Sequence, residues 1–222
     1  MLRRAPDARR AGVLACAALL GMAACRPPRL TPLMGDLVAT SRLPRATIGR
    51  GHHRILFNWE VNQYEMTTRG EGVARIAAPD SARLDFFLGG GFGAGFVVLV
   101  GDSLRTPPNS DAPKGLIPSS TLLWAALGRV ALPNLPDTVI RVEGMTLRAD
   151  IGRPVAWRLS FHGDSLFRVE RVQGDRVAEW VDRSDPSHIK YRNEGARRTV
   201  QLTVTKSEDG GDFDAAIWRF DR

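Results

Sequence analysis

From residue 51 onward, apolar and polar side chains alternate along much of the chain, and this period of two constrains the fold more than any other feature. Successive side chains of a β-strand point to opposite faces, so the alternation predicts strands with one buried and one solvated face. Four segments show it clearly: Ile55 to Val61, Leu84 to Leu88, Val155 to Phe161 and Val200 to Val204. Sheets with one solvated face are antiparallel, so the sequence predicts an antiparallel meander.

Turn-forming residues fall between these segments at hairpin spacing. The turns expected from them are Pro79-Asp80, Gly101-Asp102, Gly163-Asp164, Gly174-Asp175, Asn193 to Gly195 and Glu208 to Gly211. The glycine-rich run from Gly89 to Gly95 is followed by a strand pattern from Phe96 to Val100, whereas a dinucleotide-binding loop would be followed by a helix. We therefore expect a hairpin there, not a nucleotide site.

One helix is expected among the strands. Pro118, Ser119 and Ser120 supply a cap, Leu122 to Leu127 form an apolar body, and Gly128 ends the helix. A helix this short and this apolar has to be buried. The sequence therefore predicts an α+β fold, an incomplete half-barrel in which a strongly curved antiparallel sheet has its concave face closed by one or more short helices.

Residues 1–24 resemble a lipoprotein signal peptide. Four arginines precede an uncharged run from Ala11 to Ala24, which is too short to span a bilayer. Met22 to Cys25 resembles the bacterial lipobox, in which the cysteine is lipidated and becomes the first residue. A plain signal peptide cleaved near Ala24 is the alternative.

Loss of this leader changes what the chain can bind. It leaves 27 basic and 23 acidic residues, a net charge of +4 instead of +7, so a nucleic-acid partner is not expected. Cys25, as the lipid anchor, would leave no thiol for a disulfide or a metal. Arg26 follows it where an Asp retains lipoproteins in the inner membrane of some bacteria, which favours the outer membrane.

Residues 25–50 are expected to form a lipid-anchored tether, because they contain four prolines and scattered arginines. Thr31-Pro32 reads as a helix start, followed by Leu33, Met34, Leu37 and Val38 at helical spacing. The pattern indicates a short amphipathic helix whose apolar side packs on the domain or on lipid. Residues 51–222 then form the half-barrel domain.

The start of this domain resembles a known family. After the lipobox and tether come Phe57-Asn58-Trp59, the run from Gly70 to Ile76 and the run from Pro79 to Phe86, as in the periplasmic lipoprotein carrier and outer-membrane lipoprotein receptor (LolA/LolB-like) family. The similarity covers residues 51–204. The resemblance implies a bent, incomplete antiparallel barrel plugged by helices, a cavity for the acyl chains of lipoproteins, and no catalytic residues.

The residue pattern suits an apolar concave face of this kind. The residues expected to line it are Trp59, Phe86, Leu88, Trp157, Leu159, Phe161 and Trp180 on strands and Leu123, Trp124 and Leu127 on the helix. The same side chains could instead fill a packed interior, because most apolar faces are buried against one another.

Phe92 stands among glycines, in a place comparable to the projecting apolar loop of the family's receptor. An aromatic side chain with glycine neighbours has little local packing, so we expect it to insert into the membrane boundary. The alternative is a ring folded back on the sheet, since single exposed apolar residues are common.

Catalytic and metal-binding patterns are scarce. His52 and His53 are neighbours on a strand and point to opposite faces, while His162 and His188 stand alone. His162, Asp164 and Ser165 are the residue types of a catalytic triad, but they lie within one turn. Side chains so close in the chain cannot contact one another as nucleophile, base and orienting group. We expect no enzyme activity, no cofactor and no metal.

We therefore expect a monomeric, lipid-anchored protein on the periplasmic side of the outer membrane. It would bind acyl chains or lipoproteins in the half-barrel and hand them to a membrane without covalent chemistry. The alternative is a lipoprotein that uses the same fold to dock a protein or envelope partner.

Overall fold

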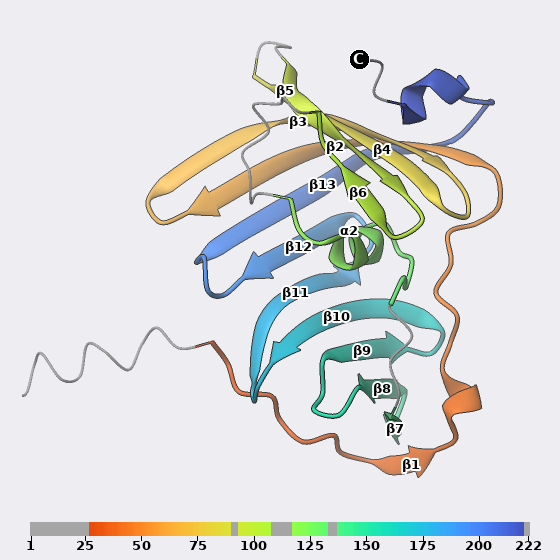
Figure 1. Ribbon diagram of the computed structural model, residues 1–222, viewed down its shortest axis with the longest axis vertical. Coiled ribbons are helices and arrows are strands. Elements are labelled where there is room, and N and C mark those ends of the chain that lie inside the picture. The colour runs from red at the N-terminus through yellow and green to blue at the C-terminus, as the bar shows by residue number, and fades with distance from the viewer. Residues whose placement is uncertain (1–26, 90–92, 108–116, 133–136, 220–222) are drawn as a thin grey trace, which may run out of the picture.

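The computed structural model describes residues 27–89, 93–107, 117–132 and 137–219, in which thirteen antiparallel strands join into one bent sheet (Figure 1). Across the sheet the order is β1-β7-β8-β9-β10-β11-β12-β13-β2-β3-β4-β5-β6. The strands are β1 (Asp36–Val38), β2 (His52–Gln63), β3 (Met66–Ala77), β4 (Ser81–Leu88), β5 (Gly93–Val100), β6 (Ser103–Arg105), β7 (Thr138–Glu143), β8 (Thr146–Ile151), β9 (Trp157–His162), β10 (Ser165–Gln173), β11 (Arg176–Asp185), β12 (His188–Asn193) and β13 (Arg198–Gly210).

Two meanders make up this sheet, β2 to β6 and β7 to β13. They join where β13 pairs with β2, with Val200 opposite Val61 and Leu202 opposite Trp59. The sheet stays open, and its edge strands β1 and β6 are only three residues long. Short edge strands offer little backbone for pairing with another chain. The predicted α+β half-barrel is confirmed.

The connection from β6 to β7 has to cross the sheet, because these strands lie near its opposite edges. It carries α2 (Ser120–Ala126) over the concave face (Figure 1). Ser119 is the N-cap, although its hydroxyl makes no capping hydrogen bond. Gly128, at a φ of +94°, ends the helix, and its N–H donates to the carbonyl oxygen of Ala125 at 3.0 Å. The expected helix and its glycine stop are confirmed.

The helix expected in residues 31–38 is absent, because this segment forms β1 instead. Asp36–Val38 pairs with β7, with Val38 opposite Ile140, and a short 3-10 turn, η2 (Thr40–Arg42), follows. Gly35 has a φ of +90°, which interrupts any helix, and a Cβ there would collide with the carbonyl oxygen of Val142. The free edge of β7 therefore supplies the backbone partners that the local sequence pattern could not reveal.

The rest of this N-terminal segment also lies against the sheet. The N–H of Leu30 donates to the carbonyl oxygen of Asp175 at 2.8 Å, and that of Val130 donates to Ala46 at 3.0 Å. The segment thus runs from the β10–β11 turn, past the β7 edge, to the end of α2 (Figure 1).

The C-terminal end differs from expectation in one respect. Residues 208–210, expected in a turn, extend β13 and pair with the start of β2. A 3-10 turn, η3 (Ala215–Trp218), then lies near β4, where Nη1 of Arg83 donates to the carbonyl oxygen of Ile217 at 3.1 Å. Within the described part of the chain, no helix is long and apolar enough to cross a membrane.

Candidate functional site

The concave face carries two apolar clusters, and α2 contributes to both. Leu122, Ala125 and Ala126 pack in a first cluster with residues of β7 to β12. Leu123 and Trp124 pack in a second cluster with residues of β2 to β5. Because neighbouring helix positions point to different sides, this short helix forms a wedge between the two halves of the bent sheet.

Most of the residues predicted to line a cavity lie on this face. Trp157, Leu159 and Phe161 belong to the first cluster, and Trp59, Leu123 and Trp124 belong to the second. Phe86 and Leu127 are half-buried against the second cluster, and Leu88 at the end of β4 is 41% exposed. Beneath α2 the buried side chains pack against one another as in a protein core.

Two aromatic rings lie along β3 because that strand has glycines opposite them. Trp59 pairs with Gly70 and Phe57 pairs with Gly72, and a Cβ on either glycine would collide with the ring. The Nε1 of Trp59 also donates to the carbonyl oxygen of Glu71 at 2.8 Å. The rings therefore form a flat apolar floor, and no polar indole nitrogen is left unpaired in it.

Two polar contacts tie α2 to the sheet, one on each side. Nε1 of Trp124 donates to the carbonyl oxygen of Gly101, in the β5–β6 turn, at 2.8 Å. Nη1 of Arg183, on β11, donates to the carbonyl oxygen of Ala126 at the end of the helix. Burial of this guanidinium lowers the pKa of Arg183, because it disfavours the charged form.

Open space lies at the two ends of α2. At its N-terminal end, a mouth of about 390 Å³ is lined by Ile117, Trp157, Tyr191 and other residues, and burial raises the pKa of Tyr191. At its C-terminal end, a cleft of about 750 Å³ lies between residues 45–47, Gly128 and the β9–β10 and β11–β12 turns. Neither opening can be predicted from the sequence, because the walls of both come from segments far apart in the chain.

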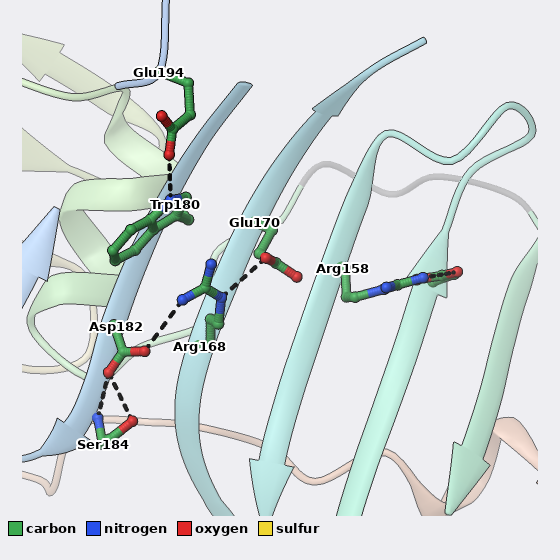
Figure 2. A network of polar contacts seen from close by, with 8 residues as sticks. Arg158, Arg168, Glu170, Trp180, Asp182, Ser184 and Glu194 are labelled. Carbon is green, nitrogen blue, oxygen red and sulfur yellow. Dashed lines mark hydrogen bonds and ion pairs between the residues drawn. The ribbon is translucent and has the colours of Figure 1, made fainter. Parts of the chain in front are cut away.

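Trp180 is not part of this face, and the prediction for it is wrong. Its neighbour Val181 packs in the first cluster, so the indole projects from the opposite, outer face of β11. There Nε1 donates to Oε1 of Glu194 at 3.0 Å, and the Arg168 guanidinium lies 4.2 Å from the ring centroid. Figure 2 shows α2 behind the strands that carry these side chains.

Trp180 belongs to a ladder of paired charges on the outer face (Figure 2). Arg168 bonds Glu170 at 2.9 Å and Asp182 at 3.3 Å. Burial raises the pKa of Asp182, but hydrogen bonds from the Ser184 backbone and hydroxyl and from Arg168 outweigh it, so the pKa lies below its usual value. The charges satisfy one another, which indicates a structural role for the ladder.

Other predicted residues lie outside the described part of the chain. These are the leader, Cys25 and Phe92, whose roles stay predictions. Among the described residues, no group of three or more His, Cys, Asp and Glu side chains could hold a metal ion. His52 and His53 each face a carboxylate at 3.1 Å, that of Asp212 and that of Asp209.

Neither a known protein-family model nor a curated protein sequence matches the chain. Solved structures do match it. A LolA superfamily protein from Nitrosomonas europaea superimposes with a TM-score of 0.53 at 9% identity, over 81% of this chain and 95% of the other. A DUF1329 family protein from Desulfovibrio piger superimposes with a TM-score of 0.50 at 10% identity, over 77% and 90%. At these identities the likeness concerns the fold alone, and the chain has a LolA-like fold.

Proposed function

We propose that this protein is a lipid-anchored envelope protein that binds acyl chains in its half-barrel and hands them to a membrane without covalent chemistry. The observation that carries the proposal is the apolar concave face of an open sheet, filled by a seven-residue helix that two side-chain hydrogen bonds tie to the sheet. The LolA-like fold supports the same function.

The free energy gained by burying an acyl chain on the concave face is similar to the free energy lost when the chain displaces α2. Burial of an acyl segment of about ten CH₂ groups gains about 8 kcal/mol, at about 0.8 kcal/mol for each group. Displacing the buried side chains Leu122, Leu123 and Trp124 costs a similar amount, at about 1.5–3 kcal/mol each. A chain can therefore replace α2 on the apolar face, and a bilayer, which buries it equally well, can take it back.

The position of the N-terminal segment supports delivery at one end of the half-barrel. The carbonyl oxygen of Pro27 accepts a hydrogen bond from Nη1 of Arg176, at the β10–β11 turn, at 2.6 Å. The β2–β3 turn lies at the same end of the sheet (Figure 1). Tyr64 in this turn and Met66, the first residue of β3, are each 70% exposed. A lipid on Cys25, two residues before Pro27, would hold this end and the N-terminal mouth at the membrane, which we place as the outer membrane.

The test is to produce the chain in a bacterial envelope with Cys25→Ser, so that it is exported without a lipid, and to identify copurifying molecules by native mass spectrometry. We expect bound fatty acyl species. Leu88→Glu, which places a charge on the concave face, should remove them. Leu37→Glu adds the same charge to a side chain that is 67% exposed on β1, and should leave them bound.

The proposal would be contradicted if the protein purifies without lipid and its Trp fluorescence does not change when lipoprotein is added. That result would favour a docking module with the same fold. Retention of acyl species by Leu88→Glu at wild-type levels would place the ligand elsewhere on the protein.

A further inference from the structure

The cleft at the C-terminal end of α2, which we call the strand-end cleft, has a volume of about 750 Å³ and a lining rich in hydrogen-bond donors. The residues that define it are Arg45, Thr47, His162, Ser165, Arg183 and Ser184. They come from the N-terminal segment, from the ends of β9 and β11 and from the start of β10. None of them packs in the two apolar clusters, although Arg183 also bonds the end of α2.

The cations of this cleft differ from the arginines that form ion pairs elsewhere on the sheet. On the outer face Arg158 and Arg168 each pair with a carboxylate, and Arg171 pairs with Glu179 at the N-terminal mouth. Within the described part of the chain, Arg45 and Arg183 have no carboxylate partner, although Asp164 also lines the cleft. Two guanidinium groups and one imidazole therefore face a shared space with one acidic side chain in its described lining.

Contacts with the end of α2 fix the Arg183 side chain, so that its remaining N–H donors face the cleft. One of its nitrogens covers the terminal carbonyl of α2 at Ala126, and a Cβ on Gly128 would stand 3.4 Å from the guanidinium carbon. The other guanidinium nitrogens are not among the buried unpaired atoms, and within the described residues they have no partner, so they open to the cleft. Planar guanidinium donors in fixed positions match an oxyanion well.

The cleft is also continuous with the apolar face. Leu166 and Ala46 line it and pack against the first cluster. A molecule with an anionic end and an acyl end could therefore occupy both regions at once. The hydroxyls of Thr47 and Ser165 add uncharged donors around the anionic end, whereas the Ser184 hydroxyl already donates to Asp182.

We propose that the strand-end cleft binds the oxyanion, a phosphate or a carboxylate, of an amphiphilic ligand whose acyl part lies along the first cluster. This inference rests on the proposed acyl-binding function. It assigns the far end of the half-barrel, opposite the membrane-facing turns, to recognition of the polar end of the ligand.

The test uses the full chain in micelles of an uncharged maltoside detergent and three probes, measured by isothermal titration calorimetry. The probes are inorganic phosphate, dioctanoylphosphatidylglycerol and the neutral dioctanoylglycerol. Arg45→Ser removes an exposed cation of the cleft without touching α2, and Arg50→Ser is the matched control on the same segment. We expect Arg45→Ser to weaken phosphate binding about tenfold, the worth of one charge-assisted hydrogen bond.

The lipid probes separate this inference from the proposed function. We expect the phosphatidylglycerol to bind more tightly than the neutral lipid, and Arg45→Ser to abolish only that difference. Binding of both lipids with equal affinity, without any phosphate binding, would overturn the anion site and leave acyl binding intact. Phosphate binding that Arg45→Ser weakens, without binding of either lipid, would support the anion site with a free anion as its ligand and overturn the acyl proposal.

Discussion

Arg158 and Asp150 lie on the outer face of the sheet, yet their side chains are only 5% and 13% exposed. Two hydrogen bonds join them, from Nε at 2.6 Å and from Nη2 at 2.8 Å. Thr31, Pro32 and Met34 of the N-terminal segment help to wall the pocket that Arg158 lines, which explains the burial of a charged pair on a solvated face.

We expect Arg158→Met to lower the free energy of unfolding by about 3–5 kcal/mol, because it leaves the Asp150 carboxylate buried without its partner. Urea denaturation followed by far-UV circular dichroism measures the change. The double variant Arg158→Met with Asp150→Leu should recover most of the loss, since it removes both charges. A double variant as unstable as the single one would show that packing, and not the unpaired charge, causes the loss.

Asp182 makes stability depend on pH in a defined direction. Its pKa in the folded protein lies below the usual value, so the folded state binds its proton less readily than the unfolded state does. The stabilisation is therefore present above the unfolded pKa of about 3.9 and is lost as the pH falls through the folded value. We expect Asp182→Asn to cost about 1 kcal/mol at pH 7 and progressively less below about pH 4. An equal cost at pH 7 and pH 3, in urea denaturation at both, would contradict this assignment.

Among the elements, α2 depends on a glycine stop to reach its two contacts with the sheet. Gly128 adopts a φ of +94°, which costs an L-residue about 1–2 kcal/mol. We expect Gly128→Ala to lower the free energy of unfolding by about 1 kcal/mol and to increase binding of the dye ANS, because the end of the helix loosens from the apolar face. Gly195→Ala is the control, since Gly195 lies in a turn outside that range of φ and its nearest neighbour is Asn193 Oδ1 at 3.6 Å. An equal effect of the two variants would contradict a special role for the helix stop.

The elements also show where sequence reasoning reaches its limit. Alternation located the long strands, and Ser119 and Gly128 bracketed α2, because these signals are local. β1 was missed because its partner β7 is about a hundred residues away, and the apolar spacing of residues 33–38 fits a helix equally well. Trp180 was placed on the wrong face because Glu179, the polar residue beside it, points inward at the N-terminal mouth. A bulge between Arg171 and Val172 shifts the register of the same pair of strands.

At the scale of the whole molecule, the two ends of the half-barrel differ in chemistry. The end with the β2–β3 turn carries the exposed Tyr64 and Met66 and the start of the described chain. The other end also exposes Met145, but it carries the strand-end cleft, whose Arg45 and Arg183 have no carboxylate partner among the described residues. Antiparallel pairing alone decides which turns share an end, so this polarity follows from the strand order. This difference between the ends could not be predicted from the sequence, because it depends on the non-local pairing of β13 with β2.

This polarity makes a prediction about which end meets the bilayer. Met66 is the first residue of β3 and Met145 lies in the β7–β8 turn; they are 70% and 69% exposed and lie at opposite ends of the sheet. In the exported Cys25→Ser chain, we expect Met66→Glu to weaken binding to phospholipid vesicles about tenfold, because a side chain that enters the apolar boundary is replaced by a charge. Met145→Glu should leave vesicle binding unchanged, although it makes the same change to an equally exposed methionine. Cosedimentation measures both affinities. Equal loss in the two variants would mean that net charge alone governs the attachment, whereas a loss confined to Met145→Glu would reverse the orientation proposed for the half-barrel.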